Sequence, residues 1–172
     1  MILATSRLTL RPADLSMLAS THAYAGDLEN TRFMMYLPYA TMEETAKMLH
    51  EAEVEWSKEQ PERYEFAIFL EESHIGGITL YMQEDRTEAE LGWVLHKDHW
   101  RKGFVTEAAL ALMDFAREIG VTRIFACCDS ENVASYKTME KLGMKLVKKD
   151  GVRTNRSMGD APRVELTYDI RW

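Results

Sequence analysis

The chain has 172 residues, of which 46% are hydrophobic and 28% charged, which fits one folded domain over residues 1–172 and excludes a disordered protein. The net charge of -7, without a contiguous basic face, argues against nucleic acid as a ligand, and no apolar run is long enough to cross a bilayer. The N-terminus lacks the long apolar core of a signal sequence. We therefore expect a cytoplasmic protein.

The spacing of apolar residues and the positions of glycine, proline and capping residues predict the secondary structure. In chain order we expect strand 8–11, helix 15–24, helix 42–60, strands 64–70, 75–81 and 89–95, helix 104–119, strand 121–127, helix 133–142, and strands 144–149 and 163–170. Residues 30–39 form an aromatic and methionine-rich loop, and residues 150–162 form a polar loop. The first loop is suited to core packing or to the wall of a pocket.

The stretch from Trp100 to Glu107 joins a strand to a helix through a short basic turn that contains Gly103. The first turn of a helix has backbone N–H groups without partners and carries partial positive charge. Arg101 and Lys102 add full charges, and a glycine without a Cβ lets an anion approach the backbone. The stretch therefore predicts a pyrophosphate site, although a basic loop before a helix is often only a solvated connection.

A strand, a helix and a second strand follow one another over residues 89–127, which predicts a right-handed βαβ unit with two parallel strands. The remaining strands are close enough in sequence to pair as antiparallel hairpins. We expect an α/β (α+β) fold in which a mixed, mostly antiparallel sheet has a central parallel strand pair and flanking helices.

Five fragments in this order resemble the GNAT superfamily of N-acetyltransferases, and more narrowly its Rim-type branch, which is named for enzymes that acetylate ribosomal-protein N-termini. They are the opening strand 7–12, the hairpin segment 75–78, the strand 90–95, the acetyl-CoA motif 100–108 and the last-helix signature 132–144. The resemblance covers nearly the whole chain and implies a GNAT-like fold in which the two parallel strands splay apart. Trp100 replaces the Gln or Arg that opens the superfamily motif, and Val105 replaces a small residue.

The resemblance implies that acetyl-CoA is the co-substrate. The pantetheine arm would lie between the splayed strands, bound by backbone groups near Val94 and Leu95. The pyrophosphate would bind Arg101, Lys102, Gly103, Phe104, Val105 and Thr106. Asn132 would contact the pantetheine amide, or it caps the helix that follows it.

Acetyl transfer to an amine needs a base for the ammonium and an acid for the departing thiolate. Glu90, acting directly or through a water, is our candidate base, and the alternative is an ordinary surface glutamate. Many family members use a tyrosine as the acid, but the matching residue here is Met139, which cannot donate. Ser135, at the Rim-type serine position, or its neighbour Tyr136 remains as the candidate acid.

Cys127 and Cys128 are adjacent in a strand and point to opposite faces, so they are suited neither to an intrachain disulfide nor, as a pair, to a structural zinc site. Either could carry an acetyl group, but inert core positions are the simpler interpretation. His96 and His99 lack a third metal ligand, so we expect no metal.

The leading prediction is an acetyl-CoA-dependent N-acetyltransferase that acts on a protein or peptide N-terminus by direct attack. One alternative is a small-amine acetyltransferase whose acceptor is a polyamine, an amino sugar or an antibiotic. A second alternative, from another class, is a non-catalytic acyl-CoA-binding regulatory module. We expect neither a nucleic-acid nor a membrane partner, and an exposed C-terminal strand edge could support a homodimer.

Overall fold

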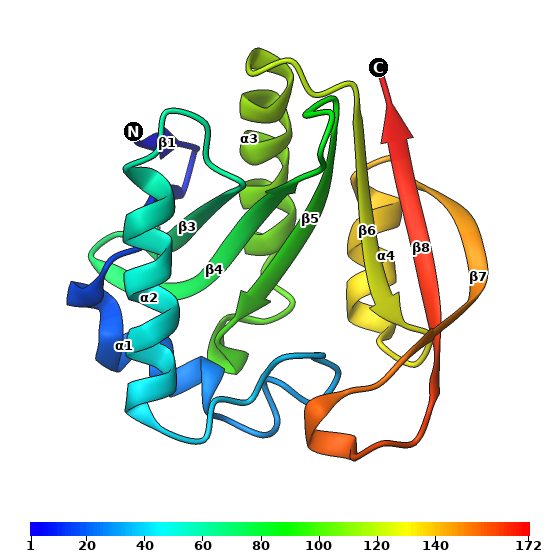
Figure 1. The fold of residues 1–172 in the computed structure, drawn as a ribbon, viewed down its shortest axis with the longest axis horizontal. Coiled ribbons are helices and arrows are strands. Elements are labelled where there is room, and N and C mark those ends of the chain that lie inside the picture. The colour runs from blue at the N-terminus through cyan, green and yellow to red at the C-terminus, as the bar shows by residue number, and fades with distance from the viewer.

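The computed structural model describes all residues, 1–172, as a mixed eight-stranded sheet with four α-helices and three short 3-10 helices (Figure 1). The strands are β1 (Leu3–Ala4), β2 (Leu8–Pro12), β3 (Arg63–Leu70), β4 (Ser73–Met82), β5 (Glu88–Leu95), β6 (Arg123–Asp129), β7 (Lys145–Arg153) and β8 (Arg163–Arg171). The α-helices are α1 (Leu18–Ala25), α2 (Met42–Trp56), α3 (Phe104–Glu118) and α4 (Val133–Lys141). The 3-10 helices are η1 (Leu15–Met17), η2 (Lys97–His99) and η3 (Arg156–Met158).

The strand order is β1-β2-β3-β4-β5-β6-β8-β7, and every neighbouring pair except β5 and β6 is antiparallel. The parallel pair arises because α3 crosses between β5 and β6, as the βαβ pattern in the sequence predicts. The expected fold class, with a mostly antiparallel sheet and a central parallel pair, is confirmed.

The parallel pair is held together over only part of its length. β5 and β6 are in register from Glu88↔Arg123 to Glu90↔Phe125, but β5 continues to Leu95 and β6 to Asp129 without a partner on that side. Meanwhile β6 pairs with β8 along all seven of its residues, so it leaves β5 rather than ending early. Figure 1 shows the two strands diverging toward their carboxyl ends.

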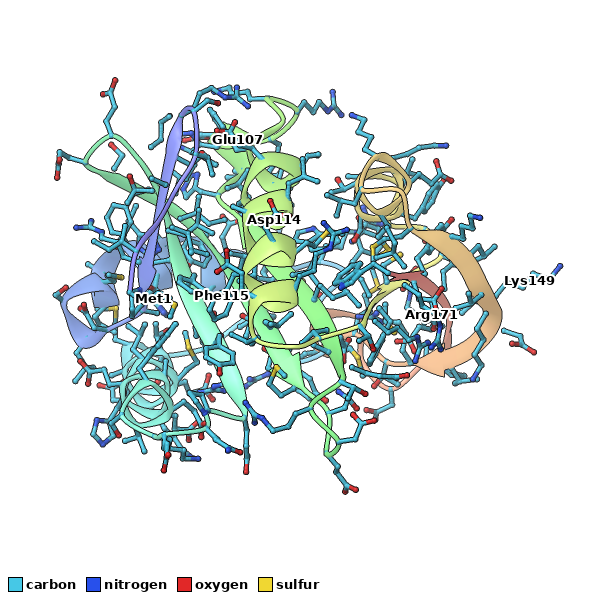
Figure 2. All side chains as sticks on the ribbon, turned by 90° about the horizontal axis from the view of Figure 1, so that it is seen from above. Met1, Glu107, Asp114, Phe115, Lys149 and Arg171 are labelled. Atoms are coloured by element: carbon cyan, nitrogen blue, oxygen red, sulfur yellow. The ribbon has the colours of Figure 1, made fainter.

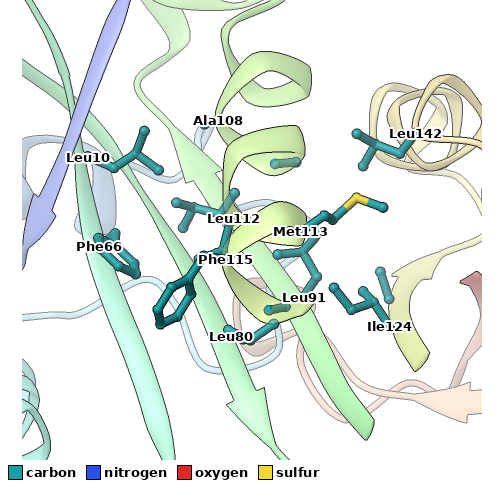
Figure 3. Packing of buried hydrophobic residues seen from close by; sticks show 14 of the residues in the cluster. Leu10, Phe66, Leu80, Leu91, Ala108, Leu112, Met113, Phe115, Ile124 and Leu142 are labelled. Atoms are coloured by element: carbon teal, nitrogen blue, oxygen red, sulfur yellow. The ribbon is translucent and has the colours of Figure 1, made fainter. Parts of the chain in front are cut away.

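The main core lies between α3 and one face of the sheet (Figure 3). It contains 26 buried residues, among them Leu112, Met113 and Phe115 of α3 and Phe66, Leu80, Leu91 and Ile124 of the sheet. A second, smaller cluster joins Leu49 and Ala52 of α2 to Ala67 and Phe69 of β3. The two faces of the sheet are therefore covered by different helices. None of the helices has both the length and the apolar character required to span a membrane.

Most predicted helix ends are reproduced, but α2 ends at Trp56 and not at residue 60 as predicted. The Thr41 hydroxyl accepts from the Glu44 amide at the start of α2, and Gly120 and Gly143 adopt positive φ just beyond α3 and α4. Met42, the first residue of α2, is exposed, and the buried residues of this helix are Thr45, Leu49 and Ala52. β7 also continues to Arg153, into the segment predicted as a polar loop, because Gly151 to Arg153 pair with β8.

Candidate active site

The turn between β5 and α3 presents unpaired backbone donors. Gly103 is the N-cap of α3 with a φ of 80°, and Arg101 also has a positive φ, 62°. The amide of Glu107 donates to the Gly103 carbonyl, whereas the amides of Phe104, Val105 and Thr106 donate to no group of the protein. Because these N–H groups lie in the first turn of a 15-residue helix, they form a site for an anion.

The turn is stiffened by hydrogen bonds before any ligand binds. The Trp100 indole N–H donates to the Leu95 carbonyl at 2.7 Å, and Lys102 Nζ donates to the Asp98 carbonyl at 2.8 Å. Asn30 bridges the same region, because its side-chain amide donates to Leu95 O and accepts from the Lys97 amide. Trp100 thus has a structural role in closing the turn.

The N-terminal segment fastens the turn to the sheet. The carboxylate of Glu107, in the first turn of α3, accepts from Thr5 Oγ1, Ser6 Oγ, and the backbone and side chain of Arg7. Burial opposes ionisation, but these hydrogen bonds outweigh it and lower the pKa of Glu107 to about 2. Arg7 also donates to the Lys102 carbonyl at 3.0 Å and lies over the Phe104 ring. Figure 2 shows Glu107 beside the N-terminal hairpin.

The free edge of β5 has a defined set of peptide groups. The His96 amide donates to Ile75 O, and the Gln83 amide donates to Glu88 O. The backbone N–H and C=O groups of the even-numbered residues of β5 therefore face β4. Peptide groups alternate sides along an antiparallel strand, so those of Trp93 and Leu95 face the gap toward β6. The Leu95 carbonyl is already occupied, which leaves the Trp93 peptide groups and the Leu95 N–H available. The peptide groups of Val94 face β4, and its side chain lies on the sheet face away from α3.

The other side of the gap is formed by the end of β6 and the start of α4. Asn132 caps α4 by accepting from the Ser135 amide at 3.3 Å. Burial is the main cause that raises the pKa of the Cys128 thiol to about 11, and a hydrogen bond with the Ser135 side chain opposes it. Met139, whose side chain cannot donate a proton, is 1% exposed in the core. Tyr136 packs against the same core and lies near Tyr168 of β8.

Glu90 lies on β5 at the point where the pairing with β6 ends. Its neighbours Ala89 and Leu91 are buried under α3, so its side chain is on the opposite face of the sheet. Burial, together with the Glu165 carboxylate of β8, raises the pKa of Glu90, while the Arg153 guanidinium opposes this shift. A carboxyl group with a raised pKa at the edge of the gap can accept a proton at neutral pH.

The aromatic loop 30–39 and the segment that follows β7 contact one another near the carboxyl ends of β5 and β6 (Figure 1). Arg153 donates to the Phe33 carbonyl at 3.0 Å, and Arg156 donates to Tyr36 O and pairs with Glu44. On the other side, Arg163 and Asn155 both donate to Asp129 at the end of β6. The two segments thus form one connected wall at this end of the gap.

Acetyl-CoA carries a pyrophosphate and an extended amide-containing arm, and the described groups fit both. The amides after Gly103 suit the pyrophosphate, and the unpaired peptide edge of β5 suits the amides of the arm. The predicted residues therefore lie around one gap, with Glu90, Ser135 and Asn132 on its two sides. The roles of Arg7, Asn30 and Trp93 were not predictable from the sequence, because they depend on strand pairing and on contacts distant in sequence.

Comparisons with known proteins agree with this arrangement. The family described as Acetyltransferase (GNAT) domain matches residues 7–145. The chain is 31% identical over 148 residues to the uncharacterized N-acetyltransferase YnaD of Bacillus subtilis (strain 168), covering 84% of this chain and 83% of YnaD. A GNAT-family acetyltransferase of known structure from Bacillus anthracis superposes with a TM-score of 0.85 at 24% identity, covering 99% of this chain and 98% of the other.

The ribosomal L7/L12 alpha-N-protein acetyltransferase RimL, solved in complex with coenzyme A, superposes with a TM-score of 0.84 at 19% identity, and the match covers 99% of this chain and 98% of RimL. At this identity the match shows a shared fold. The family match over residues 7–145 and the 31% identity to YnaD show the family as well as the fold. The chain belongs to the GNAT family and is an acetyl-CoA-dependent N-acetyltransferase.

Proposed function

We propose that this enzyme transfers the acetyl group to the α-amino group of a peptide or protein, by direct attack of the amine on the thioester. The observation that carries the proposal is the position of Glu90 beside the gap, at the edge of a sheet face that neither α3 nor α4 covers. The similarity to RimL, described as an alpha-N-protein acetyltransferase, supports a peptide acceptor. The free thiols of Cys127 and Cys128 support a reducing, cytoplasmic setting.

Glu90 accepts the proton of the incoming ammonium, directly or through a water. An α-amino group has a pKa near 8, whereas a lysine amine has a pKa near 10.4. A carboxylate base therefore deprotonates an α-ammonium group more easily than a lysine ammonium group. Acetyl-CoA supplies the activated acyl group. The Trp93 and Leu95 amides at the free edge of β5 are positioned to donate to the oxygen that gains negative charge, and one such donor is worth about 3 kcal/mol.

Ser135 is the better supported of the two candidate acids. Its side chain lies beside Cys128 on the strand that borders the gap, whereas Tyr136 lies near Tyr168 on β8. We propose that Ser135 supplies a proton to the departing thiolate, and that Asn132 both caps α4 and contacts the pantetheine arm. Arg101, Lys102 and the amides from Gly103 to Thr106 bind the pyrophosphate, helped by the segment that Arg7 anchors.

A thiol-release assay with peptides and with small amines tests this function. We expect release of coenzyme A to depend on an amine, and mass spectrometry to find the acetyl group on a peptide α-amino group. Turnover only with polyamines or amino sugars would contradict the peptide acceptor. Tight binding of acetyl-CoA without turnover on any amine would favour a non-catalytic acyl-CoA-binding module instead.

A further inference from the structure

Glu65 lies on the sheet face that carries Glu90, opposite the face that packs against α3. Its neighbours Tyr64 and Phe66 contact Phe115 of α3, so the Glu65 side chain points to the opposite face. In the register of the sheet Glu65 is opposite Thr79 of β4, and Thr79 is opposite Gly92 of β5. One row of residues therefore leads from Glu65 to the strand that borders the gap.

The Glu65 carboxylate has little compensation from the protein. Thr79 Oγ1 donates to its Oε2 at 2.7 Å, whereas Oε1 has no protein partner. The side chain of Arg63, two residues earlier, is directed to α2, where it contacts Glu51 and the Met48 carbonyl. Burial raises the pKa of Glu65, and Thr79 and Arg63 only partly offset this shift. A poorly solvated carboxylate without a counter-ion is stabilised by any cation that can reach it.

Two residues of the same face near this carboxylate, Gly77 and Gly92, have no side chain. Glu65 Oε1 and the Tyr24 hydroxyl both lie 3.4 Å from the position that a Cβ on Gly77 would occupy. A Cβ on Gly92 would meet only the ring of Tyr81, also at 3.4 Å. Gly77, Thr79 and Gly92 thus form a low floor between Glu65 and the free edge of β5.

Tyrosine side chains surround this floor. Partial removal from water, reinforced by the nearby Glu65 carboxylate, raises the pKa of Tyr24, Tyr39 and Tyr81, of which Tyr81 is 41% exposed, so all three phenols stay neutral at physiological pH. They come from α1, the aromatic loop and β4, respectively. Aromatic rings around a carboxylate attract a cation through both the ring faces and the negative charge. An anionic ligand, by contrast, would be repelled by Glu65 and Glu90.

We propose that Glu65 is a specificity-determining residue that binds a second positively charged group of the acceptor, remote from the amine that is acetylated. This inference rests on the proposed function of the gap between β5 and β6. Because two strand spacings separate β3 from β5 and the amine lies beyond β5, the second cation lies roughly 10 Å or more from the acetylated amine. A long diamine meets this requirement, and so does a peptide with a basic side chain close to its N-terminus.

The test compares acceptors that differ only in the second charge, with wild-type enzyme and Glu65→Gln. Diaminooctane is paired with aminooctanol, and a peptide with lysine at its second position is paired with the same peptide carrying norleucine. We expect Glu65→Gln to raise KM about tenfold for the dicationic acceptors and to leave KM for the monocationic ones unchanged. The diamine pair and the peptide pair show separately whether the second positive charge comes from a small diamine or from a peptide side chain.

Glu62→Gln is the matched control, because it removes the same charge from an exposed residue just before β3. It should preserve the discrimination between the paired acceptors. An acetyl-CoA-induced thermal shift of wild-type size shows that Glu65→Gln is folded. A loss of kcat for all acceptors alike would make Glu65 a general catalytic or structural residue and overturn the inference, as would no change with any acceptor. Failure of the wild-type enzyme to acetylate any amine would refute the proposed function itself.

Discussion

Arg7 and Glu107 form an ion pair of 2.7 Å although 100 residues separate them in the sequence. The pair joins the start of β2 to the first turn of α3, next to the unpaired amides that follow Gly103. Because Glu107 also accepts from Thr5 and Ser6, the N-terminal segment holds the phosphate-binding turn in place before the cofactor arrives.

The first prediction concerns Glu107→Gln, which removes a carboxylate that accepts four hydrogen bonds. We expect a loss of about 2 kcal/mol in the free energy of unfolding at pH 7, typical of hydrogen bonds to a charged group. The pKa of Glu107 is about 2 in the folded state, below its ordinary value of 4.5. Its stabilising contribution is therefore complete above pH 4.5 and is lost as pH falls toward 2. Urea unfolding of both proteins at pH 7 and pH 3 checks this, and an unchanged difference between them would contradict it.

The second prediction separates backbone strain from ligand binding at the two ends of α3. Gly103 and Gly120 both have positive φ, 80° and 93°, so alanine at either position should cost about 1 kcal/mol of stability. Only Gly103 adjoins the free amides, so Gly103→Ala should weaken acetyl-CoA binding about tenfold while Gly120→Ala leaves it unchanged. Calorimetric titration measures both affinities, and equal losses would refute the anion site.

The third prediction concerns Glu90→Gln, which keeps the shape of the side chain but cannot accept a proton. We expect kcat to fall about 100-fold or more, the usual effect of losing a general base. Because burial and Glu165 raise the pKa of Glu90, the acidic limb of the wild-type kcat profile should lie above the pKa of an ordinary glutamate. The variant should lack this limb. A wild-type pH profile in Glu90→Gln would show that another group is the base.

The fourth prediction distinguishes Ser135 from Tyr136 as the acid. Ser135→Ala should lower kcat about tenfold with little change in the acetyl-CoA KM, whereas Tyr136→Phe should leave kcat nearly unchanged. The difference follows from the position of Ser135 beside Cys128 and of Tyr136 near Tyr168. Steady-state kinetics with a good peptide acceptor measures both. The reverse order of effects would assign the acid to Tyr136.

Local sequence patterns predicted the elements well because their signals lie within a few residues. The apolar residues Leu112 and Met113 and the stop at Gly120 define α3, and the alternation in strand 89–95 defines β5. The parallel pairing followed from the helix between two strands. The sequence could not show that the pairing of β5 with β6 stops at Glu90 and Phe125. This depends on β6 pairing with β8 along its whole length.

Parts of the site that depend on distant contacts were not predictable in the same way. Nothing in the sequence connects Arg7 to Glu107, or Asn30 to Leu95. Glu65 is one of many glutamates in an acidic chain, and only the strand register brings it opposite Thr79 and close to Gly77. The sequence also could not show which peptide groups of β5 face the gap, because a shift of one residue exchanges them.

A crystal structure of the complex with coenzyme A tests the central claim most directly. The account predicts pyrophosphate oxygens within hydrogen-bonding distance of the amides of residues 104–106, and the pantetheine arm alongside Trp93 and Leu95 between β5 and β6. Coenzyme A bound elsewhere on the protein, or β5 and β6 paired along their full length with the arm excluded, would contradict it.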